Sequence, residues 1–287
     1  MTIVTAKEWW DAGATHSVDV NGVQRTVFIR DEGTGPTVTL LHGFPGSSLE
    51  WAGIWEALVA ERRVIAVDLL GFGNTDKPRR HCYRLDEQVE LVLAVWRQLN
   101  VNRTAVVAYD YGAIVAQLLL THHARPEITR AVLLNASVYP ELYRPEPIQR
   151  ALLVPGVSQL VWRLMSEPVF HRSWARVFGP EYPLDPATSH EHWLALQHGD
   201  PEGDAQRRVL RYIPERAARS DELTAALNAD TPLSFLWGMA DPVSGAVVAD
   251  AIRGRQSDPD LVEYQGVGHA PHLEIPDRVV EDLLKRI

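Results

Sequence analysis

The chain has 287 residues, of which 46% are hydrophobic and 23% charged, and its formal net charge is −9. This length suits one α/β core with a large insertion as well as it suits two domains. The Lys and Arg residues are scattered along an acidic chain, which argues against a nucleic-acid partner or an anionic-membrane surface. Cys82 is the single cysteine, so no intrachain disulfide can form and nothing indicates an oxidising compartment.

The start of the chain carries no recognisable targeting signal. Residues 1–10 lack the basic segment, apolar stretch and small-residue cleavage site of a signal peptide. No uninterrupted apolar run approaches the ~18 residues that a membrane helix needs. We therefore expect a cytoplasmic protein with no membrane partner, and the sequence leaves monomer and homodimer open.

In the first half of the chain, short apolar runs alternate with segments of helical periodicity. Two alternating runs around Asn21-Gly22 predict a β-hairpin. The strands expected next are Val38–Leu41, Val64–Val67, Thr104–Ala108 and Ala131–Leu134, and the helices between them are Leu49–Glu61, Leu85–Leu99 and Tyr111–Thr121. This order predicts a mostly parallel sheet with helices on both faces and a site at the carboxyl ends of the strands.

The strand pattern stops at about Tyr139 and does not return before Ala229. Helical stretches are expected in that interval at Ile148–Met165 and Asp204–Tyr212. The alternation resumes with a strand at Leu233–Trp237, a helix at Ala246–Arg253, a strand at Leu261–Tyr264 and a final helix from Pro276. We predict that residues 1–138 and 230–287 form an α/β core and that residues 139–229 form a helical cap, or lid, inserted into it.

The segment Val106–Ala113 has the form of a nucleophile elbow, with Asp110 where serine is commoner. The small residues Ala108 and Gly112 would allow a strand and a helix to approach closely around a strained residue. At a helix N-terminus, the helix dipole would stabilise the Asp110 carboxylate. The alternative is an aspartate that only caps the helix.

Three further motifs follow strands in the order expected for this kind of site. His42-Gly43-Phe44-Pro45 would contribute the backbone N–H of Phe44 to an oxyanion hole, with the N–H of Tyr111 as the second donor. Asp241 and His269 come after later strands and complete the order nucleophile, acid, histidine. The four motifs together predict a catalytic triad of Asp110, His269 and Asp241.

With these motifs, nearly the whole chain resembles the α/β-hydrolase superfamily, and specifically its aspartate-nucleophile branch of epoxide hydrolases and haloalkane dehalogenases. The similar stretches are HGFPGSSLEW, VIAVDLLGFGNTDKP, VVAYDYGAIVAQLLL, LWGMADP and GVGHAPHLEIP. Within that branch the chain is similar in particular to the mesoderm-specific transcript proteins, in stretches that include RVFGPEY and VLRYIPER.

An aspartate nucleophile changes the class of reaction. A carboxylate that attacks an acyl carbon would form an anhydride, whereas attack at an sp3 carbon with a leaving group forms an ester. We therefore expect displacement at carbon, followed by ester hydrolysis by a water that His269 activates. This chemistry requires no metal and no organic cofactor.

The choice between an epoxide and a halide depends on the contacts of the leaving group. The resemblance implies a Trp after the nucleophile and an Asn after His-Gly in dehalogenases, and Tyr111 and Phe44 stand there instead. It implies His-Gly-Phe-Pro and two cap tyrosines in epoxide hydrolases, and Tyr212 matches the later one. Val161 and Trp162 occupy the region of the earlier one. Tyr139, Tyr143 or Tyr182 could replace this acid. The side chains that could line an apolar pocket are Trp51, Tyr139, Tyr143, Trp162, Trp174 and Trp193.

The leading hypothesis is an epoxide hydrolase that converts a small apolar epoxide to a vicinal diol. A haloalkane dehalogenase is the alternative. A third hypothesis is a catalytically silent hydrolase fold that binds a ligand, which the complete triad makes the weakest of the three.

Overall fold

A computed structural model describes residues 3–122, 125–144, 147–154 and 156–287 and contains one eight-stranded sheet. The strand order is β1-β2-β4-β3-β5-β6-β7-β8; the two pairs that involve β2 are antiparallel and the others are parallel. The strands are β1 Ala14–Val20, β2 Val23–Glu32, β3 Thr37–Leu41, β4 Arg63–Val67, β5 Arg103–Tyr109, β6 Glu127–Leu134, β7 Leu233–Gly238 and β8 Asp260–Tyr264. The carboxyl ends of β3, β5, β7 and β8 therefore meet at one edge of the sheet.

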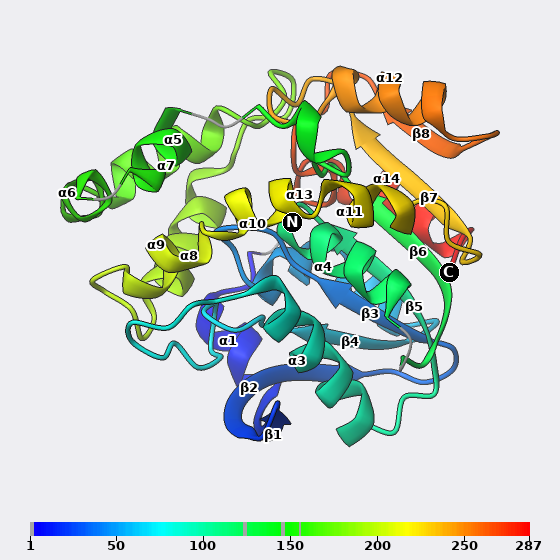
Figure 1. Cartoon of the computed structure of the whole chain (residues 1–287), viewed down its shortest axis with the longest axis horizontal. Coiled ribbons are helices and arrows are strands. Elements are labelled where there is room, and N and C mark those ends of the chain that lie inside the picture. Colours follow the sequence, from blue (N-terminus) through cyan, green and yellow to red (C-terminus); the bar gives the residue numbers. More distant parts are fainter. Residues whose placement is uncertain (1–2, 123–124, 145–146, 155) are drawn as a thin grey trace.

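Helices cover both faces of this sheet (Figure 1). One face packs against α3 Leu85–Gln98, α4 Tyr111–Thr121 and α12 Ala246–Arg255. The other packs against α1 Ala6–Asp11, a short 3-10 helix η1 Ser48–Trp51, α2 Ala52–Val59, α13 Pro271–Glu274 and α14 Pro276–Leu284. In β5, Val106 faces the first set of helices and Val107 faces the second, because successive side chains of a strand point to opposite faces.

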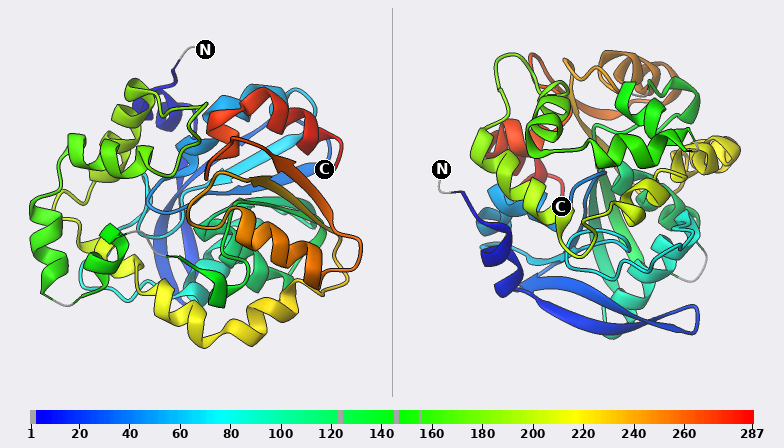
Figure 2. Two further views of the ribbon diagram at one scale, coloured as in Figure 1. Left: turned by 90° about the horizontal axis from the view of Figure 1, so that it is seen from above. Right: turned by 90° about the vertical axis from the view of Figure 1, so that its left-hand side faces the viewer.

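The chain between β6 and β7 contains helices and no strand in its described part. These helices are η2 Pro140–Leu142, α5 Pro147–Leu153, α6 Val157–Arg163, α7 Glu167–Ala175, α8 Pro186–Gln197, α9 Asp204–Val209, α10 Tyr212–Ala218 and α11 Ser220–Ala226. Helices α5 to α9 lie beside the sheet, whereas α11 packs on α4 (Figures 1 and 2). This helical segment stands over the edge at which the strands end, where a cap was predicted.

The hairpin and the strand–helix alternation are confirmed. Asn21 and Gly22 both adopt positive φ, 54° and 80°, and join β1 to β2. Helix α4 has the predicted bounds, Tyr111–Thr121, and β6 begins earlier than predicted, at Glu127.

Some predicted helices are wrong in their bounds. The expected helix Ile148–Met165 is two helices, and Gly156, with φ 82°, caps the second; residue 155 lies outside the described residues. The expected helix Asp204–Tyr212 ends at Val209, and Tyr212 instead begins α10. Helix α1 was not predicted. Thr5 and Glu8 form a capping box at its start, and their spacing in the sequence is typical of a helix N-terminus.

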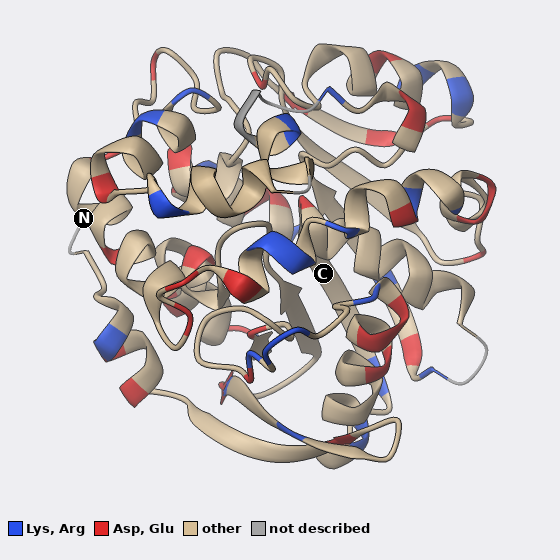
Figure 3. Ribbon diagram, turned by 60° about the vertical axis from the view of Figure 1, so that its left-hand side comes forward, with Lys and Arg blue, Asp and Glu red and all other residues tan. Residues whose placement is uncertain are grey.

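The surface carries charges of both signs next to each other. Basic and acidic segments alternate over the face drawn in Figure 3, as their scatter in the sequence indicates. None of the described helices is long and apolar enough to cross a membrane.

Candidate active site

Asp110 occupies a strained turn between β5 and α4. Its φ of 45° and ψ of −109° are unusual for a residue with a side chain. The turn needs close contacts on both sides. A Cβ on Gly112 would lie 2.3 Å from the Leu41 carbonyl oxygen, and one on Gly43 would lie 2.6 Å from the Tyr109 ring. The Asp110 side chain makes no capping hydrogen bond to α4, so the helix-cap alternative is wrong.

The loop after β3 places a backbone donor on this carboxylate. The Phe44 N–H donates to Asp110 Oδ2 over 3.0 Å. Tyr111 is the first residue of α4, where backbone N–H groups have no acceptor within the helix. The geometry at Phe44 is as predicted, and the role of the Tyr111 N–H as second donor stays a prediction.

His269 lies between the two predicted carboxylates. Its Nδ1 is 2.7 Å from Asp241 Oδ2, and its Nε2 is 3.7 Å from Asp110 Oδ1. Both His269 and Asp241 are buried. The structure thus brings together the three residues that the sequence places after β5, β7 and β8.

The side chains that hold Asp241 were not predicted from the sequence. Asn135, directly after β6, donates from Nδ2 to Asp241 Oδ2 over 2.9 Å, and its Oδ1 accepts from the Gly238 N–H over 2.6 Å. Ser244 Oγ donates to the same Asp241 oxygen over 2.6 Å, and the Val243 N–H donates to the other over 2.7 Å. The position of Asn135 at a strand end was the available signal. These contacts leave the Asp241 carboxylate a single orientation.

Mutual attraction shifts the pKa values of this pair in opposite directions. Burial lowers the pKa of His269, but the nearby carboxylates of Asp241 and Asp110 outweigh burial and hold it well above its usual value. Burial raises the pKa of Asp241, and the charge and hydrogen bond of His269, with the bonds from Ser244 and Val243, bring it below its usual value. The free site therefore favours a protonated His269 between two carboxylates.

Glu50 is a second buried acid that was not predicted from the sequence. Its Oε2 accepts from the Gly43 N–H over 2.9 Å, and the residue is 2% exposed. Burial raises the pKa of Glu50 to about 8, and the charge of Asp110 adds to the rise. Glu50 is therefore neutral at pH 7, and the loop that carries Phe44 is held by a hydrogen bond from the Gly43 N–H to an uncharged carboxylic acid. A lone acid in an apolar segment, SLEWAGIW, was the available signal.

A cavity of about 110 Å³ opens above Asp110 and His269. Apart from a few polar groups it is walled by aromatic and aliphatic side chains, mostly from the helical segment: Phe44, Pro45, Leu152, Trp162, Met165, Phe170, Trp174, Val177, Leu196 and Val243. Such a wall suits an apolar ligand, since only the carboxylate and imidazole at its base are ionisable. Among the described residues, no group of three or more His, Cys, Asp or Glu side chains is placed to hold a metal ion.

Of the predicted pocket residues, Trp162 and Trp174 line this cavity, whereas Trp51, Tyr139, Tyr143 and Trp193 do not. Trp51 is fully buried against His272, with ring centroids 4.6 Å apart, because its side chain faces α13 rather than the loop it follows. Tyr139 is also fully buried; its hydroxyl accepts from Gln256 and its ring packs under Arg255. These two predictions are wrong.

The candidate tyrosines of the helical segment have different surroundings. Tyr143 lies behind the cavity wall and donates to Gln149, which lines the cavity, over 2.7 Å. Tyr212 packs with its ring centroid 6.2 Å from that of Phe44. Burial raises the pKa of the Tyr212 phenol well above its usual value. Its ring centroid also lies 4.8 Å from that of Tyr111, the residue after Asp110, although Tyr212 is not among the residues that line the cavity. Tyr182 packs with the helices on the α14 face, outside the lining of the cavity.

Comparison with known proteins gives one family. A family model described as the alpha/beta hydrolase fold matches residues 36–276. LipZ of Mycobacterium tuberculosis, named as a hydrolase, is 33% identical over 290 residues, which cover 99% of this chain and 98% of that protein. The human mesoderm-specific transcript homolog protein is 38% identical over 74% of this chain and 66% of its own length.

Two further similarities concern proteins with named reactions. Haloalkane dehalogenase 2 of M. tuberculosis is 26% identical over 89% of each chain. The crystal structure of epoxide hydrolase VrEH1 from Vigna radiata superposes with a TM-score of 0.76 at 21% identity, covering 96% of this chain and 97% of that one. At this identity the superposition shows a shared fold.

Glu50 makes the stability of the protein depend on pH. The pKa of Glu50 is about 8 in the fold and near 4.5 in the unfolded chain. The contribution of Glu50 to the free energy of unfolding is therefore fully present below pH 4.5 and is lost as the pH rises towards 8. Glu50→Gln keeps an acceptor for the Gly43 N–H but cannot ionise. We expect the free energy of unfolding of the wild type to fall relative to E50Q by on the order of 3 kcal/mol between pH 5 and 8.

Urea unfolding at several pH values measures this difference, with Glu56→Gln, on the exposed side of α2, as the matched control. E56Q should follow the wild type. Parallel curves for wild type and E50Q would contradict a neutral, buried Glu50.

Proposed function

The chain belongs to the α/β-hydrolase family, and we propose that it is an epoxide hydrolase that opens a small apolar epoxide to a vicinal diol through a covalent ester on Asp110. The observation that carries the proposal is a carboxylate at the elbow, held between the Phe44 N–H and His269. In this proposal residues 139–229 act as the lid, since they supply most of the cavity wall.

The two oxygens of Asp110 have different surroundings, and from these we infer their roles in the first step. Oδ2 accepts from the Phe44 N–H, whereas Oδ1 faces His269. Oδ1 attacks an epoxide carbon, the C–O bond of the ring breaks, and the electron pair goes to the ring oxygen. Oδ2 becomes the carbonyl oxygen of the ester and keeps its hydrogen bond.

The electrostatics of His269 support its role in the second step. In the free site two carboxylates hold its pKa high, so it is protonated. Esterification removes the charge of Asp110, so the pKa of His269 falls and its proton passes to solvent, while the Tyr212 phenolate left by the first step regains a proton from solvent. Once neutral, its Nε2 accepts a proton from water, and the hydroxide attacks Cγ of the ester. The oxyanion forms on Oδ2, where the Phe44 N–H stabilises it. When it collapses, the Cγ–Oδ1 bond breaks, and the diol leaves with Oδ1 and with the proton that His269 took from water.

An opened epoxide also needs a proton for its alkoxide, and Tyr212 is the proposed donor. The raised pKa of its phenol keeps it protonated at neutral pH, and its ring packs against Phe44, whose N–H binds Asp110, and against Tyr111, which follows Asp110. A bound halide would need N–H donors in place of an acid. Tyr111 is fully buried on the side of the sheet that packs against α3 and is not among the residues that line the cavity, so it does not replace the indole of a dehalogenase.

A dehalogenase remains the second candidate because Trp162 and Trp174 line the cavity and because of the similarity to haloalkane dehalogenase 2. Their indole N–H groups are donors of the kind that a halide requires. The silent-fold alternative receives less support, since Asp110, His269 and Asp241 meet in one connected site.

The reaction class is tested with purified protein on styrene oxide and on 1-bromobutane. We expect diol from the epoxide, no bromide from the bromoalkane, and neither product from Asp110→Asn. His269→Gln should still form the ester but hydrolyse it slowly, so that the intact protein gains the mass of one epoxide.

Bromide release without diol would replace the proposal with the dehalogenase alternative. If D110N still forms diol from styrene oxide, this would contradict a covalent ester on Asp110.

The acid is identified by comparing Tyr212→Phe with Tyr143→Phe. Loss of a general acid commonly lowers a rate ~100-fold or more, so kcat for styrene oxide should fall by at least ~100-fold in Y212F and by less than ~10-fold in Y143F. A more acidic leaving group, as in 4-nitrostyrene oxide, should reduce the defect of Y212F. Equal losses in both variants would instead assign a pair of acids, and no loss in Y212F would remove Tyr212 from the mechanism.

A further inference from the structure

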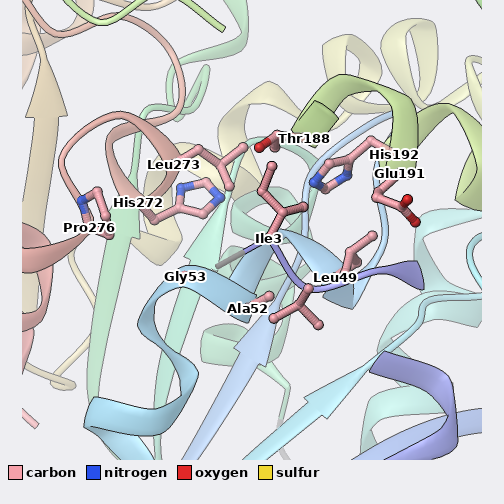
Figure 4. Close-up of a pocket in the computed structure, with 11 residues that line it drawn as sticks. Ile3, Leu49, Ala52, Gly53, Thr188, Glu191, His192, His272, Leu273 and Pro276 are labelled. Atoms are coloured by element: carbon pink, nitrogen blue, oxygen red, sulfur yellow. The ribbon is translucent and has the colours of Figure 1, made fainter. Parts of the chain in front are cut away.

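A second cavity, of about 130 Å³, lies beside His272, and Figure 4 shows the residues that line it. It is lined by the start of the described chain, η1, α2, α8, α13 and the first residue of α14, and it is partly open to solvent beside Ile3. Tyr109 separates it from the active site: its ring centroid is 5.1 Å from that of His269 and 4.6 Å from that of His272, which lines the second cavity. Nothing in the proposed reaction uses this space.

Two buried imidazoles line this cavity, and three of their four ring nitrogens have no hydrogen-bond partner in the described protein. His272 is 0% exposed, and neither of its ring nitrogens has a hydrogen-bond partner in the described protein. His192, from α8, is 5% exposed, and its Nδ1 has none either. Figure 4 shows the two rings turned into the same space from opposite sides. Buried polar groups in native proteins are nearly always satisfied, so these nitrogens indicate an occupant.

The occupant has to be uncharged and has to both donate and accept hydrogen bonds. Burial lowers the pKa of each imidazole to about 3, so both are neutral and each carries one N–H and one bare nitrogen. Among the described residues that line the cavity none is Lys or Arg, and the one carboxylate there, Glu191, already accepts from the Ala6 N–H over 2.8 Å. An anion would meet no cation, and an ammonium group could not accept from His272.

The rest of the lining is largely aliphatic. It includes Ile3, Val4, Leu49, Leu273 and Pro276. The ligand therefore has one end with two hydrogen-bonding groups, one for each imidazole, and a short apolar tail. The volume resembles that of a cavity of about 150 Å³ that holds benzene, which limits the ligand to roughly eight non-hydrogen atoms.

We propose that this cavity is a binding site for a short-chain 1,2-diol, whose two hydroxyls pair with His192 and His272 and whose alkyl chain lies on the aliphatic wall. The proposal stands on the cavity alone and holds whether or not the enzyme makes diols, although the product of the proposed reaction belongs to this class.

The probe is 1,2-hexanediol, and its matched analogue is 1,2-dimethoxybutane, which has the same number of heavy atoms and no hydroxyl donor. For the full-length wild type we expect calorimetry to give a dissociation constant of about 1 mM, typical of so small a ligand, and at least ~10-fold weaker binding of the ether. In protein labelled with 15N-histidine, the ring nitrogens of His192 and His272 should shift on addition of the diol.

Three variants locate the binding. His272→Phe and His192→Phe should each weaken it at least ~10-fold and should not lower the free energy of unfolding, because each removes unpartnered buried polar atoms. His190→Phe, on the exposed side of the same helix α8, is the control and should bind as the wild type does.

Equal affinity for the diol and the ether would overturn the proposal. So would a shift of His269 alone, which would place the diol in the catalytic cavity. A diol-soaked crystal with only ordered water between the two imidazoles would overturn it as well. None of these outcomes depends on turnover, so the site can fail while the proposed function stands.

Discussion

The strained backbone of Asp110 is the constraint on which the site depends. A residue held at such φ and ψ costs about 1–3 kcal/mol and persists only where its surroundings enforce it. Here the enforcing contacts are the approach of Gly112 to β3 and of Gly43 to Tyr109, each too close for a side chain. The turn lifts the carboxylate out of the sheet edge, so that the Phe44 N–H reaches one oxygen and the other faces His269.

The surroundings of the acids near this turn determine which of them are ionised. Three acids, Asp110, Asp241 and Glu50, lie near one histidine, and all three ionised would repel each other strongly. Asn135 and the loop after β7 stabilise Asp241 as a carboxylate, whereas burial keeps Glu50 neutral at pH 7. His269 can then be protonated opposite a free Asp110 and neutral opposite an esterified one, which is the change that a two-step hydrolysis needs.

The sequence predicted the sheet, the elbow and the grouping of Asp110, His269 and Asp241, because strand ends are marked by small and polar residues and all meet at one edge. It could not predict which way a buried aromatic side chain points. Trp51 follows the loop after β3 in sequence but faces His272, and Tyr139 faces Arg255. The bounds of the cap helices also failed, since packing rather than periodicity ends α9 before Tyr212. Supporting residues such as Asn135 and Glu50 act through hydrogen bonds that exist only after the strands have assembled.

The most direct test of the covalent aspartate is isotopic. Excess enzyme is allowed one turnover of styrene oxide in 18O-labelled water, and both the diol and the peptide that contains Asp110 are weighed. If water attacks Cγ of the ester, the first diol carries unlabelled oxygen from Asp110, and the label enters the Asp110 peptide and accumulates over further turnovers. A labelled first diol with no label in Asp110 would mean that water attacks the epoxide directly, and it would contradict a covalent ester on Asp110.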